Sequence, residues 1–185
     1  MQFLFWLFAP IVLFASHLFD QEQCLPPSMH HVIGISKFDS SIELEDGSIW
    51  RISPSETYKT LDWFLHDEIT ITQNRAWISM YHYRIVNEQT GDSLVANLFL
   101  GPHTHGQYTF YITGIDRIFG ELILTNGFGE KLGWQISSLD LYTFQHWALH
   151  DAVIIGENSD FDANCDALLI NVHLNNWIRA SQVGV

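Results

Sequence analysis

The chain has 185 residues, of which 47% are hydrophobic and 14% aromatic, and this composition excludes a largely disordered protein. Eight Lys and Arg against 21 Asp and Glu give a formal net charge of −13. A chain this acidic is repelled by phosphate backbones, so nucleic acid is not an expected partner. Anionic membrane surfaces are disfavoured for the same reason.

The N-terminal region begins with an apolar run over residues 3–14, followed by Ala15 and Ser16. Its length matches the hydrophobic region of a secretory signal peptide and is short for a membrane span. The usual positive charges before the run are missing and the cleavage site is poor, so an uncleaved anchor is the alternative. We therefore interpret residues 1–16 as a signal peptide or membrane anchor. The expected location is the periplasm, the envelope or a membrane-anchored state.

Residues 17–30 are polar and carry two adjacent prolines, which is typical of a linker. This segment contains Cys24, and the only other cysteine is Cys165. In an oxidising compartment the two can form a disulfide or remain separate thiols, and the sequence leaves both alternatives open.

Two stretches further along, residues 50–74 and 134–158, are copies of one another. Aligned without a gap they are identical at ten of 25 positions, where chance would give roughly one or two. The identical pairs are Trp50/Trp134, Ile52/Ile136, Ser53/Ser137, Tyr58/Tyr142, Trp63/Trp147, Leu65/Leu149, His66/His150, Asp67/Asp151, Ile71/Ile155 and Asn74/Asn158. The alignment extends outward and predicts two units, residues 31–98 and 111–185, joined by a linker over residues 99–110.

The first unit shows the elements most clearly. Alternating or β-branched runs predict strands at residues 31–36, 41–45, 48–52 and 68–72, followed by a hairpin over residues 81–98. Asp46-Gly47 and the segment around Gly91 have turn chemistry. Ser53, Pro54 and Glu56 form a capping-box pattern that predicts a short helical turn. Each unit therefore has about five short strands, which favours an all-β fold of two tandem, Src-homology-like β-barrels.

Three motifs follow one another in this order: Leu-x-(Asp/Asn)-Gly at residues 44–47, Trp-x-Ile-Ser at residues 50–53 and Trp-x-x-x-Asp-x-Ile at residues 63–69. Over residues 31–182 the pattern resembles a group of uncharacterised bacterial envelope-associated proteins with tandem small β-barrel repeats. The resemblance implies small barrels and an extracytoplasmic setting, and it implies no catalytic residues.

The repeat also sorts the candidate functional residues. Side chains kept in both copies are expected to serve the common fold, so His66-Asp67 and its counterpart are interpreted as turn-fixing rather than as a catalytic dyad. Residues found in one copy only are better candidates for a specialised function. No catalytic residue is assigned, and whether the protein is an enzyme stays open, with a non-enzyme favoured.

Two features belong to one part of the chain only. The linker region offers a polar and aromatic binding set, which consists of His103, His105, Tyr108 and Tyr111. The second copy carries oxygen-bearing side chains at alternate positions like the front half of a calcium loop, namely Asp160, Asp162, Asn164 and Asp166. The obligatory glycine and the bidentate glutamate of such a loop are missing. A weak calcium site and a solvated acidic loop are both compatible with this pattern, and no other cofactor is expected.

The sequence favours an exported or membrane-attached binding module of the bacterial envelope, with a protein segment or a glycan as ligand. One alternative is a small hydrolase with histidines and carboxylates between the two units, and another is a structural spacer. Binding is expected at the junction of the units and on the second copy, because the shared residues are used in making two cores.

Export should be visible in the mass of the protein. Intact-mass analysis of material from the producing cell should show loss of the N-terminal segment, or the full chain should fractionate with membrane. Recovery of the full-length chain in the soluble cytosol would contradict the interpretation of residues 1–16.

Overall fold

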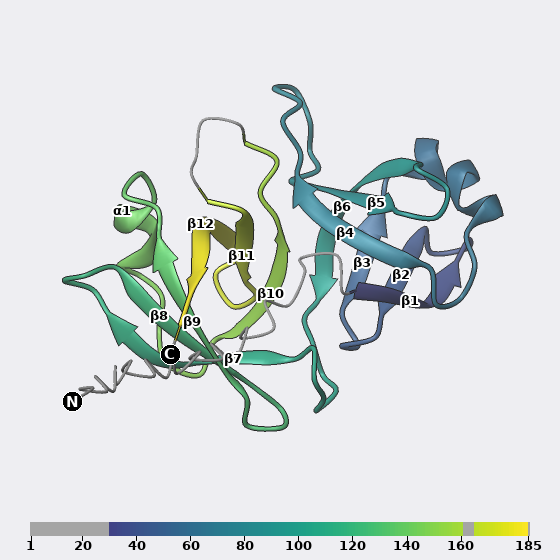
Figure 1. The fold of residues 1–185 in the computed structure, drawn as a ribbon. Helices are drawn as coiled ribbons and strands as arrows, with labels where there is room; N and C mark the ends of the chain where they lie inside the picture. The colour runs from purple at the N-terminus through teal and green to yellow at the C-terminus, as the bar shows by residue number, and fades with distance from the viewer. Residues whose placement is uncertain (1–29, 161–164, 185) are drawn as a thin grey trace, which may run out of the picture.

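The computed structural model describes residues 30–160 and 165–184, and within them nearly all regular structure is β-strand (Figure 1). The strands are β1 His30–Ser36, β2 Ser41–Leu44, β3 Ile49–Ile52, β4 Glu68–Gln73, β5 Tyr83–Asn87, β6 Ser93–Leu100, β7 Phe110–Asp116, β8 Glu121–Asn126, β9 Lys131–Ile136, β10 Ala152–Glu157, β11 Ala167–Asn171 and β12 Asn176–Val183. A 3-10 helix η1, Pro54–Asp62, follows β3, and a single helical turn α1, Leu141–Phe144, follows β9. No helix in these residues is long and apolar enough to cross a membrane. The all-β prediction is confirmed.

The first six strands close into a barrel in the order β1-β2-β3-β6-β5-β4. The ring is completed by β1 and β4, where His30 lies opposite Ile69 and His31 opposite Glu68. The barrel has six strands rather than about five, because both strands of the hairpin β5–β6 are needed to bridge β3 and β4.

The other six strands are bonded outside this barrel. Their link is β10, which pairs in parallel with β4 at Glu157 and Thr72. They follow the order β10-β11-β12-β9-β8-β7, and β7 also pairs with β10, where Phe110 lies opposite Val153. The two sets of six strands lie side by side in Figure 1. We call residues 30–100 the first half and residues 110–184 the second half.

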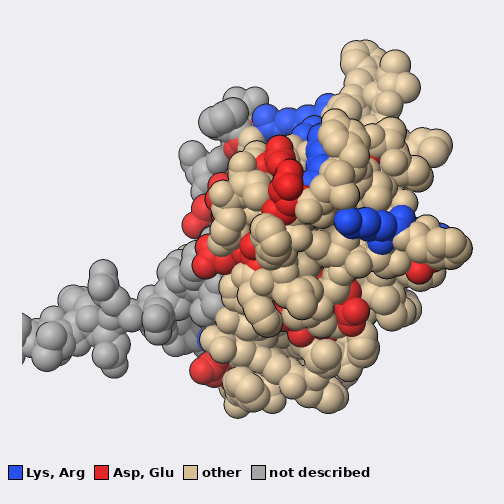
Figure 2. All heavy atoms as spheres, turned by 90° about the vertical axis from the view of Figure 1, so that its right-hand side faces the viewer, with Lys and Arg blue, Asp and Glu red and all other residues tan. Residues whose placement is uncertain are grey.

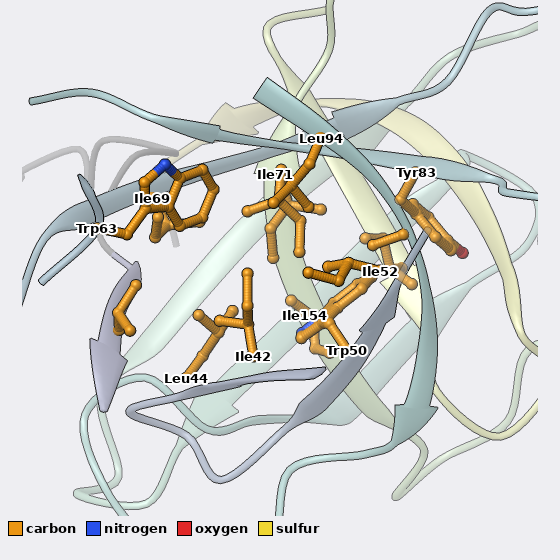
Figure 3. Close-up of a cluster of buried hydrophobic side chains, with 14 of the residues drawn as sticks. Ile42, Leu44, Trp50, Ile52, Trp63, Ile69, Ile71, Tyr83, Leu94 and Ile154 are labelled. Carbon is orange, nitrogen blue, oxygen red and sulfur yellow. The ribbon is translucent and has the colours of Figure 1, made fainter. Parts of the chain in front are cut away.

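The tryptophans kept in both copies lie in the cores, as predicted. Trp50 and Trp63 are 0% and 4% exposed, and Trp134 and Trp147 are 3% and 0% exposed. Figure 3 shows Trp50 inside the first barrel, where its ring meets that of Tyr83 edge to face at 5.3 Å. Truncating a side chain of this size in a core costs about 3–5 kcal/mol.

Strand β10 is buried on both of its faces. Ile154 belongs to the core of the first barrel (Figure 3), whereas Val153 and Ile155 belong to the core of the second half. Successive side chains of a strand point to opposite faces, so a strand buried on both sides reads as a continuous apolar run. Gly156 completes the contact, because a side chain there would collide with the carbonyl oxygen of Ile71 in β4.

The predicted capping box does not form. Ser53 makes no side-chain cap at the start of η1. The Glu56 carboxylate instead accepts hydrogen bonds from the backbone N–H of Val95 at 2.7 Å and from Lys59 at 2.9 Å. In the second half Asp140 accepts from the backbone N–H of Arg179 at 2.9 Å in the same way. The acidic side chain at this position ties the helical segment to β6 or β12. The backbone N–H of Ser53, which a capping box would bond to Glu56, donates instead to the carbonyl oxygen of Val95 at 3.0 Å.

The predicted turn-fixing role of the His-Asp pair is confirmed. Asp67 Oδ2 accepts from the backbone N–H of Phe64 at 2.8 Å and from the Asn87 amide at 2.6 Å. The counterparts of these contacts, from Ala148 and Asn171 to Asp151 Oδ2, measure 3.0 and 2.8 Å. The preceding residues, His66 and His150, are exposed and both have φ of 71°. The aspartate holds the turn, and the histidine occupies its left-handed position.

Replacing Asp67 with alanine should destabilise the protein, because two donors lose their acceptor. An unsatisfied buried donor costs about 1–3 kcal/mol. Asp151→Ala should cost a similar amount. His66→Gly is the matched control, since glycine adopts positive φ without strain and stability should be kept or should rise. Urea denaturation measures all three, and equal losses at residues 66 and 67 would contradict the assignment.

Candidate functional site

The junction between the two halves contains a buried ionic contact centred on His30, at the start of β1. Its Nδ1 lies 2.8 Å from Glu45 Oε1, and its Nε2 lies 2.9 Å from the carbonyl oxygen of Ile155 in β10. Glu45 Oε2 also accepts from the backbone N–H of His31 at 2.6 Å. Both neighbours of the ring are acceptors, so the ring donates from both nitrogens and is an imidazolium.

The electrostatics agree with this geometry. Burial alone lowers the pKa of His30, but the charge and hydrogen bond of Glu45, with help from Asp46 and the Ile155 carbonyl, outweigh it and raise the pKa to about 9. Burial likewise raises the pKa of Glu45, but the interaction with His30 and the His31 N–H outweighs it and lowers that pKa. For Asp46 burial prevails, and its pKa is raised.

The hydrolase alternative requires a histidine–carboxylate pair at the junction, and His30 with Glu45 is such a pair. Its hydrogen bonds serve to hold the structure together rather than to transfer protons. His30 is 4% exposed, and neither nitrogen has a free lone pair that can take a proton from a substrate. The pair holds β1 and β10 together. The sequence did not predict this contact, because His30 was assigned to the linker, Glu45 to a strand and Asp46 to a hairpin turn. The signal was there: the aligned residues of the second copy are Thr125 and Asn126, so the acids occur in one copy only.

The predicted linker set lies at this same end of the junction. The backbone N–H of His103 donates to the carbonyl oxygen of Asp46 at 3.1 Å. The ring of Tyr108 meets that of His31 at a centroid distance of 6.0 Å, and the rings of His105 and Tyr111 are 6.3 Å apart. Within the described residues no group of three or more His, Cys, Asp or Glu side chains could hold a metal ion. That these residues bind a ligand stays a prediction.

The opposite end of the junction is formed by the residues that follow β4, from Asn74 on, and by those that follow β10, from Asn158 on. The Asn74 amide donates to the carbonyl oxygen of Tyr81 at 2.8 Å, and the Asn158 amide donates to that of Cys165 at 2.6 Å. Asn74 and Asn158, which are aligned with each other in the sequence, therefore make the same kind of hydrogen bond. The pairing of β4 with β10 places these two positions side by side.

A groove of about 750 Å³ lies between these two segments. It is lined by residues 72–76, Arg84 and Val86 of the first half and by residues 157–160 of the second half. Gln73 Nε2 donates to Asn158 Oδ1 at 2.6 Å across its floor. Arg75 lies 3.7 Å from Asp160 across its rim. We call this feature the junction groove.

Of the predicted calcium ligands, Asp160 lines the junction groove, whereas Asp162 and Asn164 fall outside the described residues. The carboxylate of Asp160 accepts from Arg179 Nη1 at 3.1 Å in addition to its contact with Arg75. Asp160 is thus engaged with two guanidinium groups. The predicted disulfide also stays a prediction, because Cys24 lies outside the described residues.

Stability should fall as the pH rises from 6.5 to above 9. The pKa of His30 is raised on folding, so its contribution is complete below pH 6.5 and is lost as the pH passes about 9. The contribution of Glu45, whose pKa is lowered, is present above its ordinary value of 4.5 and is lost as the pH falls. His30→Gln should be less stable at pH 6.5 and should lose this dependence, which chemical denaturation at both ends of the range measures. The neighbouring variant His31→Gln should keep the dependence, and the same flat profile in both variants would contradict the assignment.

Comparison of the chain with models of protein families, with curated proteins and with solved structures found no match. The resemblance to envelope-associated proteins therefore stays a prediction.

Proposed function

We propose that the protein is an exported or membrane-attached binding module of the bacterial envelope, built from two copies of one small barrel. Its ligand is an extended peptide segment of an envelope protein, held in the junction groove. The observation that carries the proposal is the groove itself, because its walls are contributed by both halves. Clefts between two packed units are favoured positions for ligands.

The proposal that the protein consists of two copies of one small barrel is supported by hydrogen bonds at matching positions of the two halves. Both halves have the same order of strand connections. The hydrogen bonds of Glu56 and Asp140, of Asp67 and Asp151, and of Asn74 and Asn158 occur at matching positions. These matching contacts support the proposal that the second half repeats the arrangement of the first. In such a repeat the residues that follow β4 and those that follow β10 occupy corresponding positions on the two sides of the junction.

The chemistry of the groove favours a peptide over a glycan. Its lining in the described chain combines amides and hydroxyls with Arg75 and Arg84 on one wall and Glu157 and Asp160 on the other. These groups match the amide and charged groups of an extended peptide. None of the described lining residues is aromatic, whereas stacking on sugar faces requires aromatic side chains.

Filling the groove should abolish binding without unfolding the protein. Ala76 is an exposed lining residue, and Ala76→Trp should lower capture of the partner from an envelope extract roughly tenfold or more, which corresponds to at least about 1.4 kcal/mol. Ala148→Trp, at an exposed alanine outside the groove, is the matched control and should bind normally. Quantitative mass spectrometry of the captured material makes the comparison, and protease treatment of the extract should remove the partner.

Unchanged capture by Ala76→Trp would contradict the groove assignment. If capture instead falls with His103→Ala, His105→Ala, Tyr108→Ala or Tyr111→Ala, the ligand lies at the linker end of the junction. Thermal denaturation of every variant shows whether a loss of capture reflects unfolding.

A further inference from the structure

The loop over residues 74–82 presents apolar side chains outward on a fixed base. Trp77 and Ile78 are each 98% exposed, and Met80 is 82% exposed. The base is fixed by Asn74, whose amide also donates to Ser79 Oγ at 2.8 Å. Asn97 in β6 also holds the loop, because its amide donates to the carbonyl oxygen of Met80 at 2.8 Å. Ser79 and the carbonyl oxygens of Met80 and Tyr81 are thus bonded at the base of the loop, and the side chains of Trp77 and Ile78 extend into solvent.

Further apolar side chains continue this surface across the first barrel. Phe38, in the turn between β1 and β2, is 98% exposed, and Phe99 near the end of β6 is 56% exposed. Both line, together with Met80, a second groove of about 600 Å³. We call the five side chains Phe38, Trp77, Ile78, Met80 and Phe99 the apolar face. None of them is used in the core, so their exposure needs another reason.

Basic residues accompany the apolar face in a chain that has only eight of them. Lys37 precedes Phe38, and Arg75 lies at the base of the loop that carries Trp77. The guanidinium of Arg51 lies 3.6 Å from the ring centre of Phe99. In Figure 2, which looks onto the first barrel, an uncharged projection rises at the top with basic side chains at its base. Exposed aromatic and aliphatic groups beside Arg and Lys are the combination found at membrane surfaces.

We propose that the apolar face docks on a lipid bilayer, with Trp77 and Ile78 inserted into the interfacial region and Lys37, Arg51 and Arg75 on lipid phosphates. The inference rests on the membrane-attached form of the proposed function. The acidic net charge opposes anionic surfaces at long range, but screening limits that repulsion to roughly 10 Å, whereas the basic groups lie at the contact itself.

The chain outside the described residues fits this arrangement. An apolar run lies at residues 3–14, and 15 residues, 15–29, separate it from β1. Fully extended, such a segment spans about 50 Å. A chain held in the bilayer by its N-terminal run has ample length for the first barrel to turn the apolar face to the same bilayer.

A fluorophore on the loop tests the docking directly. The full chain with Cys24→Ser and Cys165→Ser receives Ile78→Cys, is labelled with the environment-sensitive dye NBD, and is bound to vesicles of phosphatidylethanolamine with a minority of phosphatidylglycerol. The matched control is Ile118→Cys, an 88% exposed apolar position in the β7–β8 turn of the second half. The dye at residue 78 should shift to the blue and be quenched by nitroxide-labelled acyl chains, whereas the dye at residue 118 should do neither.

A second measurement guards against an effect of the label. With the dye at Phe38→Cys, the double substitution Trp77→Ser and Ile78→Ser should abolish the blue shift while thermal stability is unchanged. The inference is overturned if vesicle-bound protein shows no response at residue 78, or an equal response at residue 118. It is also overturned if the blue shift appears without lipid and grows with protein concentration, which assigns the face to a second copy of the chain. Peptide capture by the junction groove is scored separately with Ala76→Trp, so the two proposals fail independently.

Discussion

The packing of β10 between two cores is the constraint on which the rest of the structure depends. Ile154 fills the first barrel while Val153 and Ile155 fill the second half, so separating the halves would expose large apolar groups on both sides. Gly156 allows the close approach to β4, and the carbonyl oxygen of Ile155 receives the N–H of His30. Strands β4 and β10 are consequently held side by side, and the residues that directly follow them meet at the junction groove.

The two ends of this junction differ in their exposure to water, and their polar contacts differ accordingly. The contact of His30 with Glu45 is buried, so removing either partner would leave an uncompensated charge in a poorly solvated place. The contact of Arg75 with Asp160 is partly exposed, and such pairs contribute little to stability. The first contact specifies how the halves fit together. The contact of Arg75 with Asp160 lies at the rim of the junction groove, where the proposed ligand would compete with it.

Predictions made from the repeat were correct for features that depend on local chemistry. The shared tryptophans are in the cores, and Asp67 and Asp151 hold their turns, because alternation and turn chemistry act over a few residues. The repeat also singled out His103 and His105, because they occur in the linker region only. It missed His30 and Glu45, which are 15 residues apart and become partners only through strand pairing.

The strands of the first unit and the core positions of the shared tryptophans could be predicted from the sequence, because side-chain alternation and the repeat are visible along the chain itself. The folded chain adds what the sequence did not predict: β10 joins β4, Ile154 of β10 belongs to the core of the first barrel, and residues after β4 and β10 line one groove. It also brings Phe38, Met80 and Phe99, which are far apart in the chain, together around one groove with their side chains exposed. The physical reason is that strand pairing between distant segments depends on the packing of the whole molecule, which no local pattern records.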